Sequence, residues 1–197
     1  IRIYVADFDE NGTLDPLLTY YIQGQESLIH SREAVLDQMI SLKKKYLTYK
    51  EFAKASVEDV VGSEAILKSS VFKASELRSV ILINEGKGQF LIKPLPEQAQ
   101  SFPVRSIITQ DLNTDGFADI ILAGNSQGAH FSYGKDMAGQ GLVLLAEEGN
   151  SYTALSAAKS GLKLNGVITS MERINNSNGT ILIAFTQADK VQILQIK

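Results

Sequence analysis

Two short acidic segments carry the side chains with the clearest capacity for chemistry. The first reads Asp-Phe-Asp-Glu-Asn-Gly-Thr-Leu-Asp over residues 7–15, and the second reads Asp-Leu-Asn-Thr-Asp-Gly-Phe-Ala-Asp over residues 111–119. Both place oxygen-bearing side chains at positions 1, 3 and 5, glycine at position 6 and aspartate at position 9. Alternate side chains of a tight loop converge on one point, and glycine allows the sharp bend. The pattern therefore predicts an oxygen cage for a hard cation, repeated twice.

Calcium is the cation that fits this pattern best. It takes about six to eight oxygen ligands in a flexible geometry, whereas magnesium demands a stricter octahedron and keeps more of its water. The residue at position 7 can add its main-chain carbonyl, and the aspartate at position 9 closes the cage. The predicted ligands are Asp7, Asp9, Asn11, Thr13 and Asp15 at the first site, and Asp111, Asn113, Asp115, Phe117 and Asp119 at the second. The alternative is a pair of Asx-rich turns that hold no ion.

Two better-known acidic motifs do not fit. An EF-hand needs glutamate at position 12 and a helix on each side, but position 12 is Leu18 or Leu122 and the flanks read as strands. An aspartyl phosphotransferase needs Asp-x-Asp directly before Gly-Thr, and here Glu10 and Asn11 intervene. The spacing between a nucleophile and its acid–base partner is then lost.

Strand-like runs with turn residues between them occupy most of the remaining chain. Apolar runs enter and leave each acidic loop, and Gly-rich turns join later pairs of runs into hairpins. The predicted strands cover residues 1–6, 17–22, 79–84, 89–92, 104–109, 120–123, 141–146, 151–155, 166–170, 180–185 and 191–196. The succession predicts a repeating unit of strand, loop and strand.

A helical insertion is predicted over residues 31–78. Ser31 can cap a helix, and capping-box spacing recurs at Thr48 with Glu51 and at Ser56 with Asp59. Gly62 is a natural helix stop. Leu36, Ile40, Leu47 and Phe52 are expected to form its apolar face.

Two segments together resemble a known repeat. Residues 111–119, followed by Ile-Ile-Leu-Ala-Gly-Asn, resemble the FG-GAP/VCBS repeat, and residues 82–90 resemble its Asn-x-Gly-x-Gly-x-Phe hairpin. The resemblance implies a β-propeller of four-stranded blades, as in integrin α-subunit heads, with calcium loops between the first and second strands of a blade. The helical insertion adds a similarity to bacterial exported proteins of the ASPIC/UnbV-like type.

The expected fold is mainly β, a partial β-propeller of about three four-stranded blades. The predicted blades are residues 1–103 with the insertion at 31–78, residues 104–160, and a degenerate third blade over 161–197. In the third, Ile174 and Leu182 replace the aspartates at positions 1 and 9, and the turn at Asn178-Gly179 is expected to bind no metal. Because three blades do not close a ring, the chain is expected to be part of a larger propeller, with edge strands that can pair with another copy.

Composition narrows the classes of function. The net charge of −3 offers no basic field for nucleic acid, and the absence of cysteine excludes disulfides and thiol chemistry. No apolar run reaches the roughly 18 residues of a membrane span. The chain begins at Ile1 without methionine and is expected to be a piece of a longer polypeptide, so any signal peptide would lie outside it.

Other chemistry-bearing residues are scattered. Candidates include His30 and His130 for a base or metal site, Lys43 to Lys45 for a basic patch, Tyr20, Tyr21, Phe131 and Tyr133 for a glycan-stacking surface, and Glu33, Asp37, Glu51, Glu58 and Asp59 as acids. Two of these acids about 5–10 Å apart in one pocket would indicate a glycosidase.

The sequence favours a non-catalytic, calcium-stabilised binding module that contacts an extracellular or periplasmic protein or glycan. Calcium is abundant enough outside the cell to fill loops of modest affinity. A domain of a polysaccharide-processing or other hydrolytic enzyme is the alternative, and a purely structural segment of a surface protein is a third.

Overall fold

The computed structural model describes residues 1–128, 134–177, 179–188 and 190–196, apart from the side chain of Asn176. The chain is mainly β and contains several antiparallel sheets, none of which closes on itself. This confirms the predicted class, while the three-bladed propeller stays a prediction. Two compact units divide the chain, Ile1–Leu77 and Arg78–Lys197.

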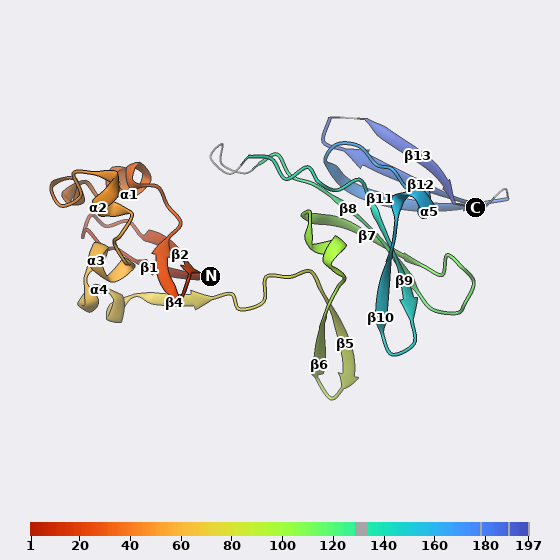
Figure 1. Cartoon of the computed structure of the whole chain (residues 1–197), viewed down its shortest axis with the longest axis horizontal. Helices are drawn as coiled ribbons and strands as arrows, with labels where there is room; N and C mark the ends of the chain where they lie inside the picture. The colour runs from red at the N-terminus through yellow and green to blue at the C-terminus, as the bar shows by residue number, and fades with distance from the viewer. Residues whose placement is uncertain (129–133, 178, 189, 197) are drawn as a thin grey trace. The chain divides into compact units, whose positions relative to one another are not determined.

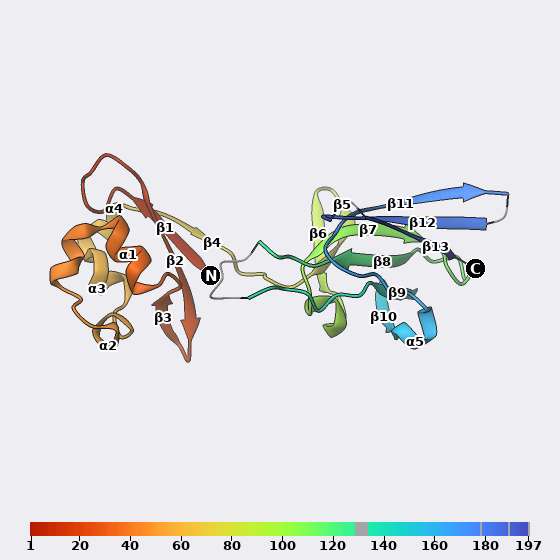
Figure 2. The same ribbon diagram turned by 90° about the horizontal axis from the view of Figure 1, so that it is seen from above.

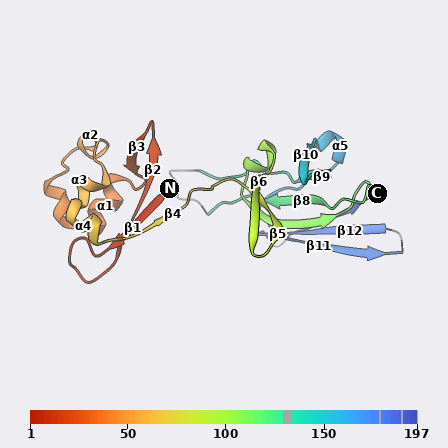
Figure 3. The same cartoon turned by 90° about the horizontal axis from the view of Figure 1, so that it is seen from below.

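The first unit combines one sheet with the helices of the predicted insertion. Its strands are β1 (Arg2–Ala6), β2 (Asp15–Ile22), β3 (Gln25–Leu28) and β4 (Ser70–Lys73), in the order β3-β2-β1-β4. Its helices are α1 (Arg32–Gln38), the 3-10 helix η1 (Ile40–Lys44), α2 (Tyr49–Phe52), α3 (Val57–Val61) and α4 (Ser63–Lys68). The helices gather on one side of the sheet (Figures 1 and 3).

The helix starts of this unit follow the predicted capping residues. Ser31 accepts a hydrogen bond from the Ala34 amide, and both predicted capping boxes form, at Thr48–Glu51 and Ser56–Asp59. A single core joins strand and helix residues: Tyr4, Leu17, Val35, Leu36, Met39, Tyr46, Phe52, Val57 and Val60. The helices therefore stabilise the unit by covering the apolar side of its sheet.

The predicted apolar face of the insertion is only half correct. Leu36 and Phe52 are buried, whereas Ile40 and Leu47 are 67% and 72% exposed. Helix α1 ends at Gln38, and a 3-10 turn follows from Ile40. The change of helix type shifts the phase of the side chains, so the spacing that starts in α1 does not continue.

The second unit contains three sets of strands. They are the hairpin β5 (Val80–Gly86) and β6 (Gln89–Pro94), the sheet β7 (Val104–Gln110), β8 (Asp119–Gly124), β9 (Leu142–Glu147) and β10 (Ser151–Leu155), and the sheet β11 (Ile168–Asn176), β12 (Gly179–Thr186) and β13 (Val191–Ile196). Two short helices, η2 (Glu97–Gln100) and α5 (Ala157–Ser160), connect them. Figure 2 shows β11 to β13 alongside β7 and β8.

Strand β8 is the centre of this unit because all six of its residues are buried. Ile121 and Ala123 face a core shared with Met171, Leu182 and other residues of the third sheet. Ile120 and Leu122 face a second core, which includes Ala99 and Phe102 and receives Ile81 of the hairpin. The middle sheet is thus covered on both faces.

Sheet membership differs from the predicted blades in two places. The hairpin at residues 80–94, predicted as part of the first blade, is a separate two-stranded sheet of the second unit. Residues 70–73, predicted within the helical insertion, form β4 and pair with β1. The β7–β10 sheet covers the residues of the predicted second blade, and the third has three described strands.

The longest helix in the described residues, α1, has seven residues. Accordingly, no helix of the described chain could cross a membrane.

Candidate metal centres

The first acidic loop joins β1 to β2 and is folded around the carboxylate at its position 1. Asp7 Oδ1 accepts a hydrogen bond from the Asn11 amide at 3.0 Å, and Asp7 Oδ2 accepts one from the Gly12 amide at 2.8 Å. The backbone has positive φ at Glu10 (59°) and Gly12 (88°). These two bends turn successive amides toward Asp7.

The second loop joins β7 to β8 and has the same conformation. Asp111 Oδ1 accepts from the Asp115 amide at 3.2 Å, and Asp111 Oδ2 accepts from the Gly116 amide at 2.9 Å. Positive φ recurs at the matching positions, Thr114 (62°) and Gly116 (90°). A non-glycine residue with positive φ is uncommon, so its recurrence at position 4 shows that the two loops share one fold.

The aspartate at position 9 closes each loop from a buried site. Asp15 and Asp119 are 1% and 0% exposed. One carboxylate oxygen of each accepts the amide of the position 2 residue, Phe8 or Leu112, at 2.8 Å. The position 9 side chain therefore fixes the start of the loop against the following strand.

The second oxygen of each closing aspartate reaches a neighbouring element. Asp119 Oδ1 accepts from the Ala146 amide of β9 at 2.8 Å, whereas Asp15 Oδ1 accepts from Gln38 Nε2 of α1 at 2.7 Å. Sequence reasoning missed both partners. Ala146 lies 27 residues from Asp119 along the chain, and Gln38 lies 23 residues from Asp15. Neither alanine nor glutamine is a residue type that indicates such a role.

The first loop gathers its carboxylates more tightly than the second. Ligand oxygens of Asp7, Asp9 and Asp15 all lie within 4.8 Å of one another, which makes them the one such acidic group in the described residues. In the second loop Asn113 replaces the acid at position 3, and its Nδ2 donates to Asp115 Oδ2 at 2.8 Å.

Both donor sets consist of hard oxygens, which is the ligand type that calcium prefers. Carboxylates at positions 1, 3 and 9 of the first loop, and at positions 1, 5 and 9 of the second, supply three negative charges each. Asn11 Oδ1 accepts from the Thr13 amide at 2.8 Å and from the Thr13 hydroxyl. Metal coordination by the main chain of Thr13 and Phe117 stays a prediction.

The other candidate residues are dispersed. His30 Nε2 is buried and has no hydrogen-bond partner among the described residues. Tyr21 is half exposed and donates to Glu26. Lys43 pairs with Asp37 at 3.3 Å, and Lys45 donates to the Asp59 carbonyl. His130, Phe131, Tyr133 and the turn residue Asn178 lie outside the described residues.

The acids of the insertion make local contacts. Glu51 and Asp59 complete the capping boxes, Glu58 accepts from the Ser63 hydroxyl, and Glu33 lies 3.5 Å from Arg32. These contacts stabilise helix termini.

A polar cluster around Glu26 was not predicted from the sequence. Glu26 of β3 accepts hydrogen bonds from Thr19 Oγ1 at 2.6 Å and from the hydroxyls of Tyr4 and Tyr21 at 3.1 Å, and Arg2 Nη1 lies 3.1 Å away. Burial raises the pKa of Glu26, but the hydrogen bonds from Thr19, Tyr4 and Tyr21 and the charge of Arg2 outweigh burial and leave the pKa below its ordinary value. The cluster ties β1, β2 and β3 together.

The low pKa of Glu26 predicts a loss of stability in acid. Because ionised Glu26 is favoured in the folded state, its contribution is full above the ordinary glutamate pKa and disappears as the pH falls through the lowered value. We expect Glu26→Gln to cost about 1–2 kcal/mol at pH 7 and to flatten this acid dependence. Urea unfolding of the unchanged chain and of Glu26→Gln between about pH 7 and 3 measures how the free energy of unfolding depends on pH. Equal pH profiles of the two chains would contradict the stabilising role of ionised Glu26.

Comparison of the chain with protein-family models, with curated proteins and with solved structures found no match in any of the three.

Proposed function

We propose that the chain is a non-catalytic β-repeat module in which two calcium ions fix the loops between neighbouring strands. The recurrence of one loop conformation carries this proposal. In both units the carboxylate at position 1 accepts two backbone amides, and a buried aspartate closes the loop. An Asx-rich turn has no need of three acids, whereas a bound cation offsets the repulsion among them, which is strongest in the first loop, where the three carboxylates converge.

The arrangement of strands is compatible with propeller blades. Each acidic loop joins two adjacent antiparallel strands of a sheet. In the second unit the sheet β7–β10 follows chain order strand by strand and is packed on both faces. These features support the proposed blade-like repeat, whose number of blades is left open.

Exposed apolar surfaces support a role in binding a macromolecule. Ile193 lies opposite Ile183, and Val191 lies opposite Phe185, on the face of the third sheet that points away from β7 and β8. Val191 and Ile193 are 51% and 67% exposed. Clusters of this kind commonly mark contacts with another protein. We place the module outside the cytoplasm, where calcium can fill loops of modest affinity.

Direct titration with calcium tests the proposal. After removal of divalent ions, isothermal titration calorimetry should detect two calcium ions per chain, and magnesium should compete weakly. Asp7→Ala and Asp111→Ala should each remove one ion, since each deletes the central ligand of one loop.

Glu10→Gln is the matched control for Asp7→Ala. It removes a negative charge from the exposed position 4 of the same loop but deletes no predicted ligand. We expect it to keep both ions. Absence of calcium uptake by the unchanged chain would reject the proposal.

A further inference from the structure

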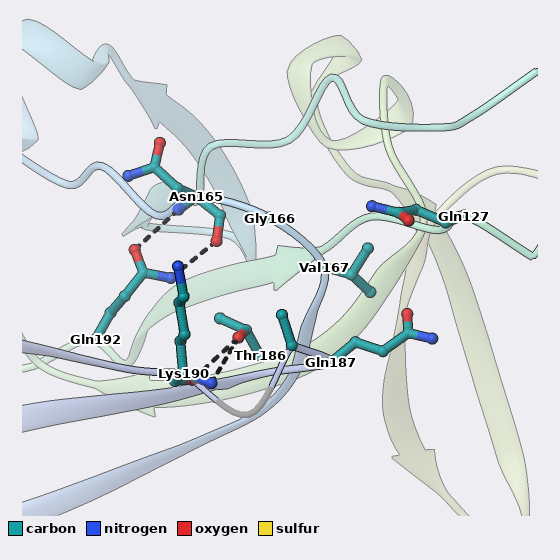
Figure 4. A pocket seen from close by; sticks show the side chains of 9 residues that line it. Gln127, Asn165, Gly166, Val167, Thr186, Gln187, Lys190 and Gln192 are labelled. Carbon is teal, nitrogen blue, oxygen red and sulfur yellow. Dashed lines mark hydrogen bonds between the residues drawn. The ribbon is translucent and has the colours of Figure 1, made fainter.

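A pocket of about 610 Å³ lies in the second unit where three connections meet. Gln127 comes from the connection after β8, Asn165 and Gly166 precede β11, and Gln187, Ala188 and Lys190 lie between β12 and β13. Pockets that bind small ligands have volumes of about 300–1,000 Å³. Figure 4 shows the side chains of Gln127 and Gln187 on one side and those of Asn165, Lys190 and Gln192 on the other.

Buried hydrogen bonds hold these connections in place. Asn125 is 1% exposed, and its Nδ2 donates to the carbonyls of Gly139 at 2.7 Å and Gly166 at 2.8 Å. Its Oδ1 accepts from the Gly139 amide at 2.8 Å. A fully bonded buried amide of this kind specifies a single backbone arrangement. The connection after β8 is thereby fastened to the segment before β11.

Two further contacts fix the remaining side of the pocket. The amide of Gln187 donates to the carbonyl of Val167 at 3.0 Å. The side chain of Gln192 bonds the backbone of Asn165 twice, at 3.0 and 2.8 Å (Figure 4). These contacts fix the backbone of the pocket, so a ligand would have to order only the exposed side chains that line it.

The polar groups of the lining come from a few side chains. Four side-chain amides contribute to it, from Gln127, Asn165, Gln187 and Gln192. The side chains of Asn165, Gln187 and Lys190 have no hydrogen-bond partner within the part of the chain that the structure describes. Lys190 is the single charged residue among the described lining residues. The pocket thus offers amide donors and acceptors together with one ammonium group.

We infer that this pocket binds an acidic oligosaccharide, with a uronic acid residue as the group recognised. Side-chain amides can both donate to and accept from sugar hydroxyls, and the ammonium of Lys190 complements a carboxylate. This inference goes beyond the proposed function, because it adds a sugar ligand to the protein contact argued from the exposed face of the third sheet.

The pocket is separate from the calcium loop of the same unit. Strand β8 runs from Asp119, which closes the loop, to Gly124, next to the pocket segment. A six-residue strand spans about 20 Å. The ion would therefore stabilise the unit without touching the sugar.

Binding of a uronic acid trisaccharide to the full chain tests the inference, with the methyl ester of the same trisaccharide as the neutral probe. By isothermal titration calorimetry in calcium buffer we expect the acid form to bind with a Kd below about 1 mM and at least about fivefold more tightly than the ester. Lys190→Ala should weaken binding of the acid form about tenfold and leave the ester unchanged. Gln187→Ala should weaken both forms by about fivefold.

Lys163→Ala is the matched control because Lys163 is an exposed lysine of the same unit outside the pocket lining. We expect it to change binding less than about twofold. Asp189 precedes Lys190 in the sequence and lies outside the described residues, so Asp189→Asn is included and should bind the acid form at least as tightly as the unchanged chain. Circular dichroism confirms that each variant is folded.

The inference is overturned by an absence of saturable binding of either form up to about 10 mM, by equal affinity for acid and ester, or by an acid preference that survives Lys190→Ala. Repeating the titration in chelator, below the melting temperature measured there, separates calcium bridging from recognition by Lys190. A preference that disappears in chelator while the chain stays folded also overturns it. Calcium uptake without sugar binding would reject the pocket assignment alone, whereas failure of calcium uptake would reject the proposed function.

Discussion

Removal of calcium is expected to lower the melting temperature of both units. An ion that binds only the folded form adds RT ln(1 + [L]/Kd), or about 2.7 kcal/mol when calcium is at a hundred times its Kd. For units of this size, that loss corresponds to a fall of roughly 10 °C or more. Differential scanning calorimetry in calcium and in excess chelator measures the difference.

Variants can assign this effect to particular loops. Asp111→Ala should abolish most of the calcium response of the second unit and leave that of the first, because each unit holds one loop. Asn176→Ala lies in the third repeat, which lacks the acids at positions 1 and 9, and is expected to leave both responses intact. Identical melting curves with and without chelator would show that the loops form without an ion.

Local sequence patterns predicted most of the strands and the starts of α1, α2 and α3, because short-range physics determines them, but they did not predict β3. The caps at Ser31, Thr48 and Ser56 require only a side chain and the next few amides. The last strand was predicted at residues 191–196, where β13 lies. Alternation of apolar residues and turn chemistry are sufficient for such elements.

Pairing between strands that are distant along the chain was harder to predict from the sequence. Strand β4 has four exposed residues and lies directly after α4, so its sequence resembles the end of the insertion. Its partner is β1, with Arg2 opposite Lys73, some seventy residues away. Backbone hydrogen bonds select this pairing, and they carry no residue signature. The same reason explains why the hairpin β5–β6 was predicted in the wrong sheet.

Candidate ligands were predictable because a tight loop brings its own residues together. The contacts that hold each loop against the rest of the fold could not be predicted, as the different partners of Asp15 and Asp119 illustrate. Likewise, the pocket near Asn125 collects residues from three connections, and none of its segments forms a motif.

The closing aspartate of the second loop should matter even without calcium. Asp119 is fully buried, and its two oxygens accept the amides of Leu112 and Ala146 at 2.8 Å each. Asp119→Ala leaves both amides without a partner, and an unsatisfied buried donor costs about 1–3 kcal/mol. We therefore expect a loss of about 2–5 kcal/mol in the free energy of unfolding, measured by urea denaturation in chelator.

Alanine variants of other acids in the two loops separate this structural role from metal binding. Asp115 is exposed, so Asp115→Ala should reduce calcium affinity but cost less than about 1 kcal/mol in chelator. Asp15→Ala should fall between the two, since one of its donors is the side chain of Gln38, which can turn toward water. Were Asp119→Ala no more costly than Asp115→Ala in chelator, the closing aspartate would act only through the ion. If Asp119→Ala still lowers the free energy of unfolding without calcium, the buried carboxylate fixes the conformation of the loop by itself. The loop then holds the remaining acids close together, and a bound cation reduces the repulsion between them.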